Sequence, residues 1–181
     1  MTRFLRRTPP LRGQRGYALT ELLTVLAILT IVLGGLTALF VSATRAEVDM
    51  RKRFEAQQDA RLAMDALRRE VHCASAITPT VPSSTVTLTL PSGCPTGSGS
   101  VTWRTQNVGT SRYELWRDSG TTSKRYADYL TLANAFTYTA ATTDKRARLH
   151  VEFPVDIDLG DTIPSYKLAD DLVLRNTSPT G

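Results

Sequence analysis

The chain opens with a polar, basic stretch and continues into a long apolar one. Residues 1–16 contain five arginines and no acid, and no residue from Leu22 to Val41 is charged. About 20 apolar residues in an α-helix are enough to cross a bilayer. We therefore predict a membrane-spanning helix over 17–41 whose threonine hydroxyls bond backbone carbonyls one turn back.

The helical pattern continues beyond the apolar run but becomes amphipathic. There is no Pro or Gly between Ser42 and Ile77, so nothing in this segment interrupts a helix. Apolar residues recur along it, the later ones at alternating steps of four and three, and predict one stripe that packs against a globular domain. We predict that the helix extends over 42–77. The stripe comprises Met50, Phe54, Ala60, Met64, Leu67, Val71 and Ala74.

The period changes from helical to alternating after Pro79. Short alternating runs separated by Gly, Pro, Ser and Asp are typical of strands joined by turns. They lie at 85–90, 101–105, 113–117, 125–130, 135–139, 148–153 and 172–175. Residues 78–181 therefore predict a β-rich globular head, an antiparallel meander of five to seven strands that covers the stripe. The expected fold class is α+β, with one long N-terminal helix packed on an antiparallel sheet.

The positive charge of the chain belongs to its leader. Five of the 22 basic residues lie in 1–16, which leaves 17 basic against 17 acidic residues elsewhere. Arginines beside a membrane helix hold that end in the cytoplasm, so we expect a single-pass protein with an exported C-terminal domain. A neutral remainder disfavours nucleic-acid binding without excluding it, because small basic clusters remain at 51–53, 124–125 and 145–148.

Two pairs of residues leave alternatives open. Cys73 and Cys94 either form one bridge in an exported domain or remain as two free buried thiols. Gly34 and Gly35 are either ordinary membrane-helix composition or a weak point where the helix can bend. No His or Cys spacing indicates a metal site, and no pattern indicates a cofactor or a catalytic nucleophile. We therefore do not expect an enzyme.

Glu21 is a lone carboxylate at the start of the apolar run. A charge at membrane depth is costly and usually has a function. The segment Gly16-Tyr17-Ala18-Leu19-Thr20-Glu21-Leu22 resembles the type IV prepilin signal, so the chain resembles a pilin or pseudopilin. The resemblance implies that a prepilin peptidase cuts after Gly16 and methylates the new N-terminus at Tyr17. It also implies that Glu21 neutralises the amine of a neighbouring subunit and so sets the register of assembly.

Two further segments are similar to specialised members of this family. Residues 59–71 and 171–176 resemble minor pilins of the W type and pseudopilins of the J type. The resemblance implies a structural subunit of a type IV pilus or type II secretion pseudopilus. Such a subunit sits in the lipid bilayer before assembly and then in an extracellular or periplasmic fibre. Its partners would be the prepilin peptidase, other pilin or pseudopilin subunits and a membrane assembly platform.

Three other functions stay open at this point. A conventional signal peptide could end after Ala43, which would release a secreted binding domain. A plain single-pass anchor would carry the head with no role in a fibre. A competence-type pilin would bind DNA through the basic clusters, the second of which (124–125) lies close to Tyr126 and Tyr129.

Overall fold

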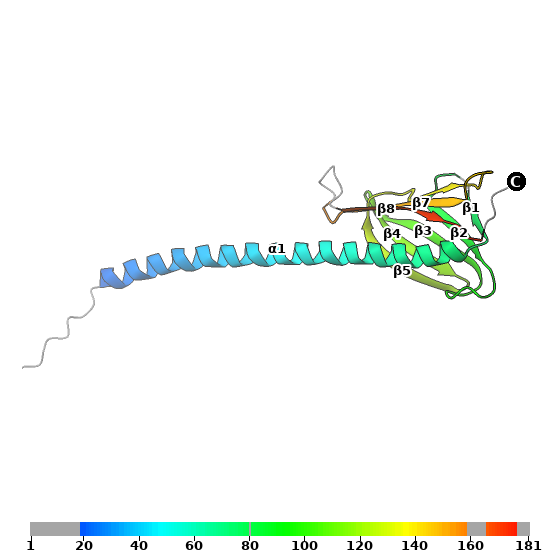
Figure 1. Ribbon diagram of the computed structural model, residues 1–181. Helices are drawn as coiled ribbons and strands as arrows, with labels where there is room; N and C mark the ends of the chain where they lie inside the picture. Colours follow the sequence, from blue (N-terminus) through cyan, green and yellow to red (C-terminus); the bar gives the residue numbers. More distant parts are fainter. Residues whose placement is uncertain (1–18, 80, 159–165, 177–181) are drawn as a thin grey trace, which may run out of the picture. The chain divides into compact units, whose positions relative to one another are not determined.

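The computed structural model describes residues 19–79, 81–158 and 166–176. One helix, α1 (Leu19–Cys73), precedes the strands, and the architecture is α+β as predicted (Figure 1). The contacts divide the chain into one unit that ends at Ala46 and a second that begins at Glu47. The strands are β1 (Ala76–Thr78), β2 (Thr85–Leu90), β3 (Gly99–Gly109), β4 (Arg112–Ser119), β5 (Thr122–Leu130), β6 (Phe136–Thr139), β7 (Arg148–Val155) and β8 (Tyr166–Val173).

The strands of the described residues form one curled antiparallel sheet. The first five are neighbours in sequence order, which is the predicted meander. β7 then lies between β6 and β8 and is joined to β5 through the pairing of Leu130 with Val155. Ser83 pairs with Phe136, so the start of β2 also touches β6. These two connections hold the meander and the β6–β7–β8 group together.

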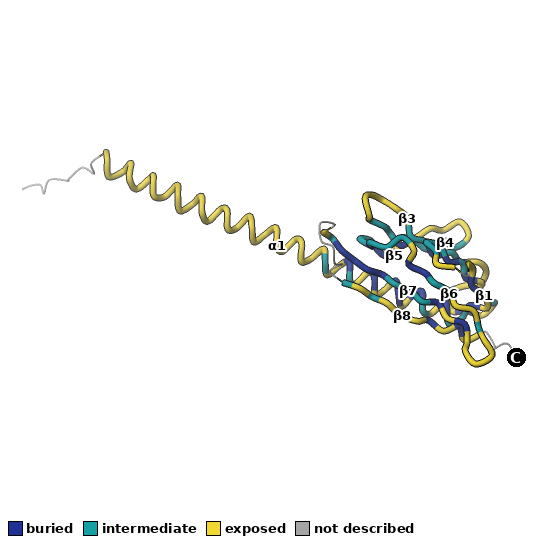
Figure 2. Tube along the Cα trace, turned by 90° about the horizontal axis from the view of Figure 1, so that it is seen from above, coloured by how far each residue is buried: buried dark blue, intermediate teal, exposed yellow. Residues whose placement is uncertain are grey.

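The second half of α1 packs against this sheet through one stripe of small and apolar residues. The buried helix residues are Ala56, Ala60, Ala63, Met64, Ala66, Leu67, Glu70 and Val71. The alanines let the backbone approach the strands closely, because they add little bulk at the contact. Figure 2 shows the contrast with residues 19–46 of the helix, which are exposed throughout. The core is completed by large side chains of the strands, among them Trp103, Phe136 and Phe153.

The predicted stripe is wrong at its first two positions. Met50 is 71% exposed and Phe54 is 67% exposed, and the first helix residue of the hydrophobic core is Ala56. Periodicity identifies which face of a helix is apolar. It does not identify where the covering sheet begins.

The helix also ends earlier than the predicted boundary at 77. α1 stops at Cys73, and Ala76–Thr78 instead pairs with β2 as β1. Ser75 directs the chain away from the helix, because its backbone N–H and its hydroxyl both donate to the carbonyl of Thr89, at 2.9 and 3.1 Å. The β-branched residues at 77 and 78 and the proline at 79 favour extended backbone here.

Glu70 links the helix to the sheet by a buried ionic contact. Glu70 is only 2% exposed. One carboxylate oxygen accepts a hydrogen bond from Trp103 Nε1 at 2.6 Å, and the other accepts from Arg117 Nε at 2.8 Å. Because Trp103 lies on β3 and Arg117 on β4, a single side chain fixes α1 against two strands.

We predict that Glu70→Gln lowers the free energy of unfolding by about 3 kcal/mol, because it leaves the mostly buried Arg117 guanidinium without its counter-charge. Urea unfolding followed by tryptophan fluorescence measures this, since Trp103 lies at the contact. Glu47→Gln is the matched control: its side chain is 74% exposed and pairs with Arg51 at 3.9 Å, so the change should be within about 0.5 kcal/mol. Equal effects of the two substitutions would contradict the assigned role.

Candidate functional site

The N-terminal part of α1 presents apolar side chains on all sides. Its most apolar 18-residue window has a mean hydropathy of 2.5, and none of that window is buried within the chain. The helix is long and apolar enough to span a membrane. Exposed apolar surface of this extent is unfavourable in water, so this segment requires lipid or other helices around it. These properties are consistent with a membrane-anchored single-pass protein.

The threonine hydroxyls of this apolar segment form hydrogen bonds within the helix itself. Thr24, Thr30 and Thr37 each donate to the backbone carbonyl three or four residues earlier, at 2.9, 2.8 and 2.8 Å. The prediction made for these three residues is therefore confirmed. Because the hydroxyls are bonded within the helix, they add little cost in an apolar environment.

Glu21 lies in the first turn of α1, where a negative charge is favourable near the positive end of the helix dipole. Glu21 is exposed, and among the described residues no basic side chain lies within ion-pair distance of its carboxylate. Gly16 and Tyr17 lie outside the described residues. The predicted cleavage, the methylation and the pairing of the new amine with Glu21 therefore stay predictions.

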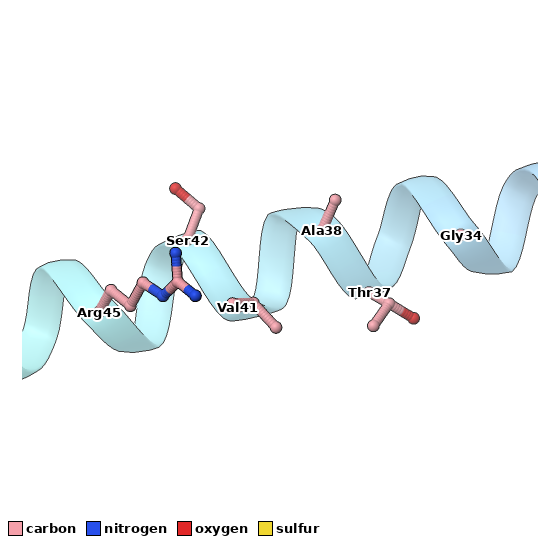
Figure 3. Close-up of a pocket in the computed structure, with 6 residues that line it drawn as sticks. All are labelled: Gly34, Thr37, Ala38, Val41, Ser42 and Arg45. Atoms are coloured by element: carbon pink, nitrogen blue, oxygen red, sulfur yellow. The ribbon is translucent and has the colours of Figure 1, made fainter.

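The two glycines of the apolar segment lie within continuous helix. A Cβ added at Gly34 or Gly35 would meet nothing within 4 Å, so no contact among the described residues requires a glycine there. Gly34 also lines a shallow groove along the helix, at whose end lies an arginine (Figure 3). The groove residues are Gly34, Thr37, Ala38, Val41, Ser42 and Arg45. Small residues at this spacing are typical of faces where membrane helices approach each other.

A disulfide is formed by the last residue of α1, Cys73. Cys73 is bonded to Cys94, with the two Cα atoms 6.0 Å apart, so the structure has the bridge and not the pair of free thiols. Asn176 adds a second tie, because its Nδ2 donates to the carbonyl of Cys73 at 2.6 Å. The end of the helix is thus fixed to the loop after β2 and to the chain after β8. Disulfides persist in oxidising compartments, which agrees with an exported head.

One arginine of each basic cluster considered for DNA is paired with an acid, the first being Arg51, which lies 3.9 Å from Glu47. Arg125 contacts Glu114 at 2.6 Å and Asp128 at 3.5 Å, and the hydrogen bond to Glu114 raises the pKa of the arginine. Arg148 lies 3.8 Å from Asp171. Arginines held by carboxylates of their own sheet are less available to phosphates.

The link from Glu70 to Trp103 and Arg117 was not predicted from the sequence. One signal was present: Glu70 lies between Leu67 and Val71, so it interrupts an otherwise apolar stripe. An acid at such a position has to find a partner on the covering element. Helix periodicity could have marked the residue, but it could not have named a tryptophan on one strand and an arginine on the next.

The prokaryotic N-terminal methylation motif matches residues 11–37. The chain is therefore type IV pilin-like. The match covers Gly16, Tyr17 and Glu21 together with the first part of the exposed apolar helix, and it implies processing by a prepilin peptidase and assembly with other pilins. No curated protein and no solved structure matches the chain.

We predict that replacing Gly34 and Gly35 together by alanine strengthens the helix around these positions. Each glycine costs about 1 kcal/mol in a helix interior relative to alanine, and the added methyl groups meet open space. Amide hydrogen exchange in detergent micelles should become slower over residues 33–38. Ala38→Gly should do the opposite, and unchanged exchange in both variants would exclude a weak point here.

We also predict that the double substitution Cys73→Ser and Cys94→Ser lowers the free energy of unfolding by about 3 kcal/mol, because it removes a cross-link that closes a loop of about 20 residues. Denaturant unfolding under oxidising conditions measures the loss. The unsubstituted protein treated with a reductant is the control and should match the variant. If reduction leaves its stability unchanged, the bridge contributes nothing.

Proposed function

We propose that this chain is a minor structural subunit, a minor pilin or pseudopilin, of a type IV pilus or a type II secretion pseudopilus. The observation that carries the proposal is an apolar helix, exposed on all sides, that begins within the methylation motif and has Glu21 in its first turn. The match to this motif also supports prepilin processing over a conventional signal peptide. The role requires no catalysis by the chain itself.

The proposed mechanism of assembly starts with cleavage after Gly16. The new amine of Tyr17 has an unperturbed pKa near 8, so it is mostly cationic at neutral pH, and methylation keeps the charge. A carboxylate and an ammonium each carry a desolvation cost among packed helices, which their pairing offsets. A helix that enters the fibre out of register leaves Glu21 and a neighbouring amine unpaired. The pair would therefore set the axial position of each subunit.

A packing relation supports the choice of a minor subunit. The two segments that resemble minor pilins and pseudopilins, 59–71 and 171–176, lie side by side in the head. Leu172 and Leu174 belong to the same core as the buried face of α1, and Asn176 bonds the end of the helix. The resemblance thus concerns two segments that pack together.

The proposed location follows from the same properties. Before processing, the subunit would lie in the bilayer with its basic leader in the cytoplasm and its disulfide-bonded head outside. After processing it would join other subunits, through the assembly platform, in a periplasmic or extracellular fibre. The partners in that fibre would contact the apolar helix first, because the described residues of this chain leave it uncovered.

We predict that Glu21→Ala leaves cleavage intact but lowers incorporation into fibres at least tenfold, because the incoming amine loses its counter-charge. The measurement is the ratio of the subunit in sheared fibres to that in the membrane fraction. Glu47→Ala, which also removes one exposed carboxylate from α1, should incorporate normally.

Intact mass separates the underlying processes. A chain that begins at Tyr17 with one added methyl group supports prepilin processing, whereas a chain that begins at Thr44 supports ordinary secretion. Normal incorporation of a correctly cleaved Glu21→Ala protein would remove the register role and leave the processing route standing.

A further inference from the structure

β8 forms an edge of the sheet. Among the described residues it pairs with β7 alone, and the pairing is regular from Tyr166 to Val173 (Figure 1). An edge strand presents unpaired backbone N–H and C=O groups, which can pair with another chain. With eight consecutive residues and no register shift, β8 is longer than β1 and β6, the other strands at edges of the sheet.

The other strands with a free side carry features that hinder added pairing. β1 is three residues long and is followed by Pro79, and β6 is four residues long. β5 shows two register shifts against β4, and its Tyr129 has a φ of 61°, in the left-handed region. Short length, proline and irregular register are common protections of sheet edges. β8 has none of these three. It does carry the charged residues Lys167, Asp170 and Asp171, each of which is paired with an opposite charge of this chain.

The ladder of β7 shows which backbone groups of β8 face outward. The N–H of Leu174, just after β8, donates to the carbonyl of Ala147 at 2.9 Å. In an antiparallel pair every second residue exchanges hydrogen bonds with the partner strand, so the even-numbered residues of β8 bond to β7. The N–H and C=O groups of Lys167, Ala169 and Asp171 then face away from it. In agreement, the N–H of Asp171 bonds the side chain of Asp170 at 2.9 Å. Lys167 and Ala169 have no such cap in the described residues.

Basic side chains of the helix border this edge. Arg61 donates to the Tyr166 hydroxyl at 3.0 Å and lies 5.4 Å from the centre of its ring. Arg68 pairs with Asp170 at 2.7 Å. Arg61 has no ion pair with a described carboxylate, so its charge is not neutralised there.

Positive charge also gathers beside the C-terminal end of β8, near the last turn of α1. Burial, followed by the positive charges of Arg175 and Arg68, lowers the pKa of His72. Arg175, like Arg61, has no ion pair among the described residues. The helix side of the β8 edge therefore favours negative side chains over positive ones.

We infer that β8 receives an acidic extended segment of another protein as an added strand. The backbone of that segment would pair with Lys167 and Ala169, and its acidic side chains on the helix side would face Arg61. Strand addition of this kind takes its affinity from main-chain bonds and its specificity from alternate side chains. The inference concerns the head and does not rest on the proposed assembly of the apolar helix.

The test uses the full chain in a neutral detergent and three capped heptapeptides. The first alternates glutamate with valine and should bind. The second alternates lysine with valine, and the third is the first with alternate backbone amides methylated so that they cannot donate. We expect both to bind at least tenfold more weakly in fluorescence anisotropy, because one lacks the charge and the other lacks the backbone bonds.

A pair of substitutions at one position isolates the backbone contribution. Ala169→Pro removes an N–H that faces away from β7, so the existing ladder keeps its bonds. We expect it to lower the affinity for the acidic peptide at least tenfold, whereas Ala169→Val keeps the N–H and should stay within twofold. Arg61→Gln should lower the affinity severalfold. Unchanged urea midpoints would show that the head remains folded in each variant.

Three results would overturn the inference. Equal binding of the methylated peptide would mean that the acidic peptide is held by charge alone. A dimer that Ala169→Pro abolishes, without binding of the acidic peptide, would mean that a second copy occupies the edge. Absence of binding by all three peptides would mean that β8 accepts no such strand.

Discussion

The position of α1 on the sheet depends on how the buried carboxylate of Glu70 is satisfied. Glu70 enters the core on a helix otherwise lined by alanine, leucine, methionine and valine, and an unpaired charge there would be strongly destabilising. Trp103 and Arg117 take one carboxylate oxygen each, so the contact fixes both the position and the rotation of α1 on the sheet. A purely apolar stripe would allow the helix to slide by one turn with little change in buried area. The ionic contact removes that freedom.

The disulfide acts on the same helix in a different way. Cys73 lies one turn beyond Glu70, and its bond to Cys94 fixes the point at which helix gives way to strand. The bridge acts mainly by restricting the unfolded chain, whereas the Glu70 contact acts in the folded state. Together they hold the last turns of α1 and leave the residues before Ala56 outside the core. The exposed Met50 and Phe54 lie before the part of the helix that the sheet covers.

The sequence predicted the elements well where a pattern was local. Alternation located β2 at its observed bounds of 85–90, because apolar and polar residues alternate there without interruption. It placed the last strand at 172–175, whereas β8 begins at Tyr166, because Lys167, Asp170 and Asp171 hide the alternation and form ion pairs with other elements. The motif residues Gly16, Tyr17 and Glu21 stood out in the sequence alone. The partners of Glu70 and the open edge of β8 did not, since both depend on which strands become neighbours.

Glu70 and Glu21 are the same chemical group in two apolar stretches of one helix, and the fold treats them differently. Glu70 finds a cation and an indole within its own chain, so its charge is part of folding. Glu21 has no cation within reach among the described residues, and its helix has no cover. If the cost of a buried charge must be offset wherever that helix packs, the partner has to come from outside the described chain. The amine that the predicted cleavage after Gly16 would create meets this requirement without adding a residue to the protein. It would make the end of one processed helix the counter-charge for Glu21 of the next.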